Sequence, residues 1–146
     1  MFLATTNPLE YRYMWTNAWL VLYTWLQHTA PDLPHFGEDE WTWVRGAFCT
    51  IDRPYGPFDW MHHHIGSTHV AHHLFSYMPC YHAQEATAAL KAYLEPKGLY
   101  HYDATPFPLA AWRVTHECHY VEAVNGIQHY KSLRDIAKKD KSKKVA

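Results

Sequence analysis

The chain of 146 residues has few cysteines, and no pattern pairs them. Cys49, Cys80 and Cys118 are an odd number at wide spacing, and no C-x-x-C pair occurs. This usage excludes a short disulfide framework of the kind that holds small secreted domains together. We therefore expect reduced thiols that face the cytosol.

The chain also lacks a strong net charge and a secretory signal. Its formal charge is -1, which gives no global attraction to nucleic acid. The first ten residues contain no basic segment followed by an apolar core and a small-residue cleavage site. Neither a nucleic-acid partner nor secretion is expected.

A long uninterrupted apolar run is missing as well. Residues 14–27 are mostly apolar, but a span of the hydrocarbon core needs about 20 such residues. Tyr11, Tyr13 and Trp25 lie where aromatic side chains would mark a membrane interface. The segment is consistent with the last part of a spanning helix or with a buried helix of a soluble protein.

Proline and glycine residues divide the remaining chain into predicted helices and loops. Helical spacing of aromatic residues predicts an amphipathic helix over 41–48, and Pro54, Gly56 and Pro57 predict a loop over 52–59. Residues 66–68 should end one element and cap the next helix, which ends by Pro79. The later expectations are a helix over 83–94 that packs through Ala86, Ala89, Leu90 and Tyr93, a helix near 110–118, a strand-like stretch near 119–124 and a solvated basic tail over 138–144.

Aromatic residues and histidines are the two abundant classes. Aromatics make up 16% of the chain, with seven Trp and eleven Tyr, which suits a large apolar interior or a membrane boundary. Thirteen histidines are the stronger anomaly, because neutral imidazole is a common ligand of transition metals. A metal site is the leading hypothesis.

One histidine motif has the spacing of a ligand set. His69, His72 and His73 stand at i, i+3 and i+4, so one helix presents all three within one turn. Crowded imidazoles repel one another once protonated, and a bound metal relieves that cost. The spacing leaves zinc, copper and iron open.

Several sequence words around this motif resemble those of membrane-bound fatty acid desaturases of the methyl-end (omega-3 and delta-12) group. They include Thr-Trp-Leu-Gln-His-Thr at 24–29, Thr-Ile-Asp-Arg at 50–53 and His-His-Ile-Gly-Ser-Thr-His-Val-Ala-His-His-Leu-Phe at 63–75. Leu-Pro-His-Phe at 33–36, Glu-Trp-Thr-Trp-Val-Arg-Gly-Ala at 40–47, Met-Pro-Cys-Tyr-His-Ala-Gln-Glu-Ala-Thr at 78–87 and Tyr-Val-Glu at 120–122 continue the series. The resemblance runs from about residue 17 to about residue 122, in the family's order.

The resemblance implies an all-α integral membrane desaturase fold and an oxygen-dependent, non-haem di-iron enzyme. His69, His72 and His73 resemble the third histidine box, and His28 stands where the family keeps an added ligand. The implied partners are a fatty acyl lipid substrate, molecular oxygen, a cytochrome b5 type electron donor and the membrane. The words at 66–73 and 78–84 resemble omega-3 sequences slightly more than delta-12 ones; hydroxylases and conjugases share them.

The family's first two boxes have no counterpart before His28, so the chain resembles a carboxy-terminal portion that is inactive alone. We expect the end of a transmembrane region over 1–29, a cytosolic helical cap with the third box over 30–130, and a basic disordered tail over 131–146. Lys143 and Lys144 resemble a dilysine retrieval signal, which indicates a multi-pass protein of the endoplasmic reticulum with a cytosolic carboxy-terminus. One alternative is a non-catalytic partial protein that binds metal or associates with a full-length desaturase. Another is a soluble zinc–histidine module.

Overall fold

A computed structural model of the protein describes residues 8–122 and 125–135, and these residues are mostly helical, as the sequence predicts. A small antiparallel sheet is the exception; it pairs His35 with Gln128 and Phe36 with Ile127. The helices are α1 (Pro8–His28), α2 (Trp43–Phe48), α3 (Pro57–Met61), α4 (His69–Leu74), α5 (Ala83–Leu94) and α6 (Phe107–Glu117), the 3-10 turns are η1 (Cys80–His82) and η2 (Glu95–Lys97), and the strands are β1 (His35–Phe36) and β2 (Ile127–Gln128).

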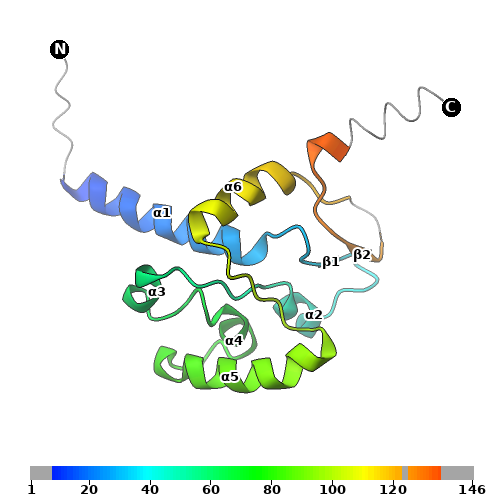
Figure 1. Ribbon diagram of the computed structural model, residues 1–146, viewed down its shortest axis with the longest axis horizontal. Coiled ribbons are helices and arrows are strands. Elements are labelled where there is room, and N and C mark those ends of the chain that lie inside the picture. The colour runs from blue at the N-terminus through cyan, green and yellow to red at the C-terminus, as the bar shows by residue number, and fades with distance from the viewer. Residues whose placement is uncertain (1–7, 123–124, 136–146) are drawn as a thin grey trace, which may run out of the picture.

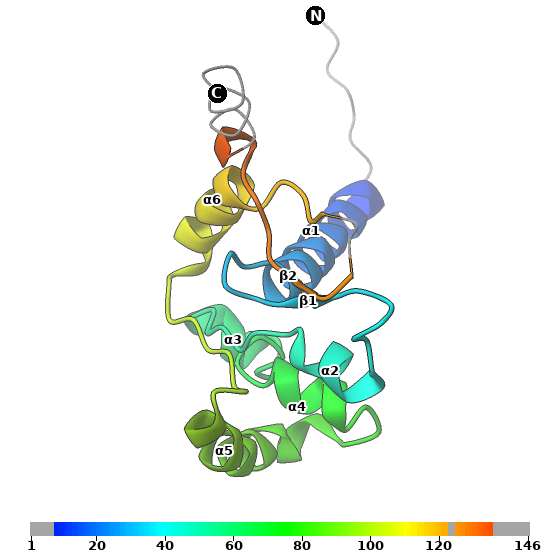
Figure 2. The ribbon, with the colours of Figure 1, turned by 90° about the vertical axis from the view of Figure 1, so that its right-hand side faces the viewer.

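The helices form two groups on either side of an extended segment. Helices α1 and α6 pack together, while α2, α4 and α5 pack on the other side (Figures 1 and 2). Residues 50–53 run between the groups: the amide of Ile51 donates to Gln27 at the end of α1, and the amide of Arg53 donates to Gly66 just before α4. This segment therefore joins α1 to α4.

Aromatic side chains fill the core between α1 and α6. Tyr23, Leu26, Tyr55 and Val114 are buried together, and the rings of Tyr23 and Tyr55 lie 4.2 Å apart. Burial of such rings is a major source of stability in a small domain. The core holds the carboxyl end of α1 against the rest of the protein.

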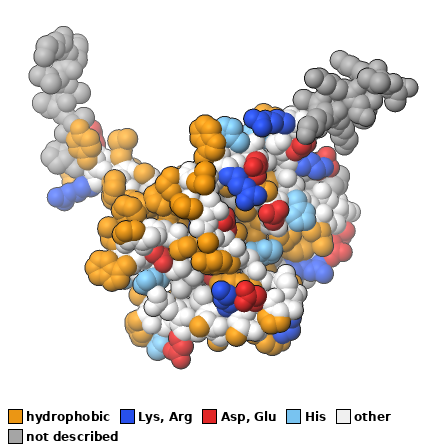
Figure 3. Space-filling model, in the orientation of Figure 1, with side chains coloured by type: hydrophobic (Ala, Val, Ile, Leu, Met, Phe, Trp, Pro, Cys, Tyr) orange, Lys and Arg blue, Asp and Glu red, His pale blue; other side chains and the backbone are white. Residues whose placement is uncertain are grey.

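The outer face of α1 is different. Large apolar side chains along it stay exposed, and they gather on the left of the space-filling view (Figure 3). Within residues 8–122 and 125–135, no helix combines the length and apolar character of a membrane span.

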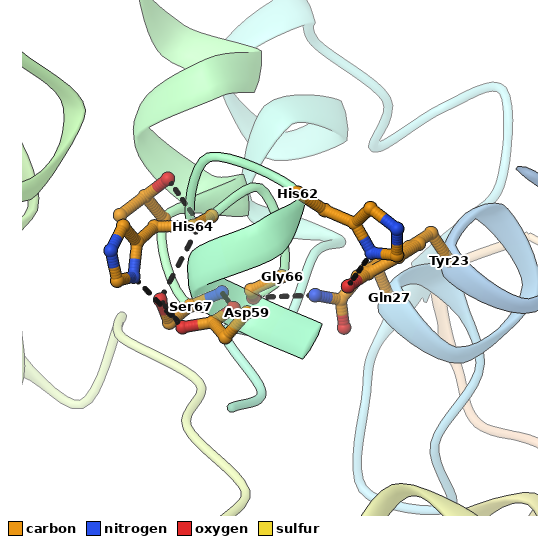
Figure 4. A network of polar contacts seen from close by, with 8 residues as sticks. Tyr23, Gln27, Asp59, His62, His64, Gly66 and Ser67 are labelled. Atoms are coloured by element: carbon orange, nitrogen blue, oxygen red, sulfur yellow. Dashed lines mark hydrogen bonds and ion pairs between the residues drawn. The ribbon is translucent and has the colours of Figure 1, made fainter. Parts of the chain in front are cut away.

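A tight turn connects α3 to α4. The buried carboxylate of Asp59 accepts hydrogen bonds from the amide and hydroxyl of Ser67 and contacts Nδ1 of His64 at 3.1 Å (Figure 4). His63 and His64 both have positive φ angles, of 55° and 62°, which L-residues adopt at a cost. The contacts of Asp59 hold this strained turn in place.

Several expected boundaries are confirmed and others change. Helix α5 spans the predicted residues, but Ala89 and Tyr93 are exposed, so the packing stripe is wrong at these two positions. The loop predicted over 52–59 ends earlier, because Pro57 starts α3. The helix at the histidine motif ends at Leu74, ahead of Pro79.

The end of the described chain returns to the fold. Tyr120, in the predicted strand-like stretch, forms an antiparallel bridge with Lys131, and the amide and hydroxyl of Ser132 donate to Asp135. Residues 131–135 of the predicted tail are thus placed against the protein. The lysine-rich part over 138–144 and the dilysine pair lie outside the described residues.

Candidate metal centre

Three of the four histidines singled out from the sequence meet at one point. Nε2 of His28, at the end of α1, lies 3.4 Å from Nε2 of His69 and 3.1 Å from Nε2 of His73. The Nε2 atoms of His69 and His73 lie 3.2 Å apart. These residues are the one group of three or more potential ligands that the described part of the chain brings within 4.8 Å.

Backbone carbonyls fix the protonation of two of these rings. Nδ1 of His28 lies 3.2 Å from the carbonyl of Cys49, and Nδ1 of His69 lies 3.2 Å from that of Ile65. A carbonyl can only accept, so Nδ1 is the donor in each ring, and in the neutral form of the ring Nε2 keeps its lone pair. Two such lone pairs cannot hydrogen-bond to one another.

Burial keeps the imidazoles of His69 and His73 neutral. Desolvation, followed by the charges of His73 and His28, lowers the pKa of His69 to about 3. Desolvation, followed by His28 and His72, lowers the pKa of His73 to about 4. Neutral imidazole is the form that binds metals, so His69 and His73 need no deprotonation near pH 7.

The separations of the three nitrogens fit a shared cation. Nitrogen ligands about 2.1 Å from a metal, at angles between 90° and tetrahedral, lie about 3.0 to 3.4 Å apart. The three measured separations cover nearly that range. An all-imidazole set suits zinc, copper or iron, and its three members leave coordination positions open.

His72 lies apart from this group. Its ring centroid is 5.5 Å from that of His69 and 5.7 Å from that of His73, and its side chain is exposed. It lines an open groove of about 510 Å³ together with His69. The rest of the groove is mostly apolar, with Trp15, Trp19, Leu20, Tyr23 and Ile65 in its wall.

The neighbouring histidines take other partners. Nδ1 of His62 lies 3.0 Å from the hydroxyl of Tyr23 (Figure 4). The ring of His62 also lies against that of Trp19, with centroids 4.8 Å apart. His64 contacts Asp59 instead. The contacts of His62 fasten the turn before α4 to α1, and that of His64 joins this turn to α3.

The sequence did not identify one residue beside the centre. Asp52 is fully buried, and its carboxylate accepts a hydrogen bond from the amide of Val70 in α4. Desolvation raises the pKa of Asp52 to about 6, against the opposing effect of the hydrogen bonds from Tyr100 and from the amides of Val70 and His69. The one sequence feature that could have identified Asp52 is its place in Thr-Ile-Asp-Arg at 50–53, a segment that resembles the desaturase family.

Comparison with known proteins identifies the family of the chain. The sequence model described as "Fatty acid desaturase" matches residues 8–106, which is more than half of the chain. The chain belongs to the fatty acid desaturase family. No solved structure matches it.

Curated relatives carry delta-12 and omega-6 names. The chain is 54% identical over 110 residues to the Delta(12)-fatty-acid desaturase of Vernicia fordii, covering 75% of this chain and 28% of the relative. It is 52% identical over 120 residues to the Delta(12) fatty acid desaturase of Mortierella alpina, covering 82% of this chain and 30% of the relative. It is 56% identical over 106 residues to the "Omega-6 fatty acid desaturase, endoplasmic reticulum isozyme 2" of Glycine max, covering 73% of this chain and 27% of the relative. This desaturase chain thus spans less than a third of the length of these relatives.

Proposed function

We propose that the chain supplies part of the iron site of an oxygen-dependent acyl-lipid desaturase. The observation that carries the proposal is the meeting of the Nε2 atoms of His28, His69 and His73 within 3.4 Å of one another, which a cation at their centre would stabilise. The relatives' names support desaturation over a zinc module, and membership of the desaturase family supports iron as the metal. Bound iron would supply the oxygen chemistry that removes two hydrogens from an acyl chain.

We assign His72 to a second iron. It belongs to the same box but turns away from the shared point of the other three, and it keeps an exposed ring. The other ligands of this second iron would come from segments that correspond to the parts of the relatives outside the match. On this proposal the chain is a carboxy-terminal portion, with the end of a transmembrane region over 1–29 and a cytosolic cap over 30–130.

The apolar groove is the place we propose for the acyl substrate. It borders both His69 and His72, so a chain lying in it would pass beside both proposed irons. Trp19 and Leu20 would exclude water from the reacting methylenes. A cytochrome b5 type protein would supply electrons, and the printed name of the Glycine max relative supports the endoplasmic reticulum membrane as the location.

The position of the double bond is a finer proposal. The sequence words favour omega-3 slightly, whereas the relatives' names support delta-12. We give delta-12 the first place, with omega-3 second.

A chimeric enzyme tests the proposal. The matching segment of the Mortierella alpina desaturase is replaced by this chain and expressed in yeast grown with and without supplied linoleate, and fatty acids are profiled by gas chromatography. A new dienoic acid in cultures without linoleate indicates delta-12 activity on oleate, and a new trienoic acid in cultures with linoleate indicates omega-3 activity. His28→Ala and His72→Ala should each abolish the product, whereas His82→Ala, at an exposed histidine of η1, should not.

Three outcomes contradict parts of the proposal. An inactive chimera supports the non-catalytic alternative, in which the chain binds metal or associates with a complete desaturase. Activity that survives His28→Ala removes this residue from the ligand set. A product formed by the 146-residue chain alone contradicts the need for further histidines.

A further inference from the structure

Helix α4, which carries the histidine box, is capped by a distant residue. Thr68 occupies the N-cap position, but its hydroxyl donates to the carbonyl of His64 instead of accepting from the helix. The amide of Val70 donates to Oδ1 of Asp52 at 2.8 Å. Asp52 therefore satisfies a first-turn amide that a local cap would normally satisfy.

The carboxylate of Asp52 is held firmly from its other side. The hydroxyl of Tyr100 donates to Oδ2 at 2.5 Å. The backbone of Asp52 pairs in parallel with Tyr102: its amide donates to His101, and its carbonyl accepts from Asp103. With no exposed surface and bonds on every side, Asp52 has one available position.

The same extended segment also contacts His28, the proposed ligand at the end of α1. The carbonyl of Cys49, three residues before Asp52, accepts from Nδ1 of His28, and the hydroxyl of Thr50 lies 3.4 Å from that nitrogen. Residues 49–52 thus contact His28 on one side and the first turn of α4 on the other. The relative position of His28 and His69 depends on this bridge.

We propose that Asp52 is a positioning residue of the metal centre, which holds the first turn of α4 so that Nε2 of His69 meets those of His28 and His73. The proposal rests on the metal site described above. Contacts outside the ligand shell set ligand orientation and commonly change metal affinity by about 10- to 100-fold. The side chain acts through its acceptor oxygen, so an amide should replace it and a methyl group should not.

Cobalt(II) binding to the 146-residue chain tests this role. Visible absorption follows the ion, giving both a dissociation constant and a spectrum that reports ligand geometry. Asp52→Ala should raise the dissociation constant at least about tenfold and shift the spectrum. Asp52→Asn keeps an acceptor for the amide of Val70 and should stay within about threefold of the unchanged protein, with the original spectrum.

A matched variant separates positioning from general loss of a buried carboxylate. Asp103→Asn removes the ion pair with Arg53 on the adjoining segment, without touching α4. Cobalt binding by this variant should be unchanged, and circular dichroism should establish that each variant is folded. If Asp52→Ala does not fold, Tyr100→Phe takes its place, because it frees Oδ2 of Asp52 and should weaken binding about threefold.

Each result decides between the two proposals. Unchanged affinity and spectrum in folded Asp52→Ala, or in Tyr100→Phe where that variant is used, overturn the positioning role and leave the metal site standing. Asp52→Asn binding as weakly as Asp52→Ala also overturns it. If the unchanged chain shows no cobalt spectrum that His69→Ala abolishes, the metal site and this inference both fail.

Discussion

Replacing Gly66 with alanine should destabilise the protein by about 2 kcal/mol. Gly66 immediately precedes the capping residues of α4, and its carbonyl accepts from the side chain of Gln27 and the amide of Arg53. A Cβ there would lie 2.5 and 2.6 Å from ring atoms of Tyr55 and 2.8 Å from the carbonyl oxygen of Arg53. Carbon atoms do not approach so closely without displacement of their neighbours.

The neighbours cannot easily move. The ring of Tyr55 is 1% exposed, stacks on Phe107 and contacts Tyr23, and the third close atom belongs to the backbone. Overpacking of this kind costs about 1–3 kcal/mol, and alanine's smaller loss of chain entropy recovers about 0.4–1 kcal/mol. Two rigid contacts favour the upper end of the first range, which gives the net loss of about 2 kcal/mol.

Urea unfolding of the metal-free protein, followed by tryptophan fluorescence, measures the change. The matched control is Gly46→Ala in α2, where the nearest atom is the end of the Trp41 side chain at 3.1 Å. Trp41 is 58% exposed and can move, and alanine is the better helix former, so this variant should be neutral or more stable by up to about 1 kcal/mol. Equal free energies of unfolding for the two variants would refute the argument.

Three other results are expected. Acidification below pH 6.5 should destabilise the metal-free protein, because the lowered pKa values of His69 and His73 mean that the unfolded state binds more protons. His69 contributes up to about 1.4 kcal/mol per pH unit toward its pKa of about 3, and Asp52, whose pKa burial raises to about 6, offsets part of this loss below pH 6. Urea titrations at pH 7 and 5 measure the net change, and a pH dependence that His69→Ala leaves unaltered would contradict the argument. Asp103→Ala removes the carboxylate that pairs with the buried guanidinium of Arg53 and should cost about 3 kcal/mol in thermal or urea unfolding, and no loss would indicate that water replaces the carboxylate. Iodoacetamide at pH 8 should label exposed Cys80 well before Cys118, because burial raises the pKa of the Cys118 thiol to about 11. Mass spectrometry at early time points measures the order of labelling, and earlier labelling of Cys118 would contradict the argument.

The sequence predicted those elements whose causes are local. Helix α5 has good helix formers between Pro79 and Pro96, and its observed bounds match the prediction. Its exposed side could not be predicted in the same way, because the side of a helix that packs depends on where the rest of the chain lies. Tyr93 fits the periodic stripe and is nevertheless exposed.

The centre shows the same division between local and distant causes. In an α-helix, residues four apart differ by about 40° around the axis, whereas His72 and His73, as neighbours, differ by about 100°. A partner arriving from one side therefore meets His69 and His73 and misses His72. The spacing alone placed three histidines on one helix turn, and the approach of His28 from α1 separated them into two kinds.

The contacts that assemble this centre join distant parts of the sequence. His28 meets His73 across 45 residues, and Asp52 meets Val70 across 18. Such pairings form only when α1, the segment 49–53 and α4 are packed together, so the centre reports on the tertiary fold rather than on the propensity of one helix. The six residues of α4 are too few to be a stable helix in isolation, which means that the geometry of the box comes from the residues around it. Buried Asp52 and close-packed Gly66, neither of which belongs to the histidine cluster, are therefore two positions through which the surrounding fold can shape the site.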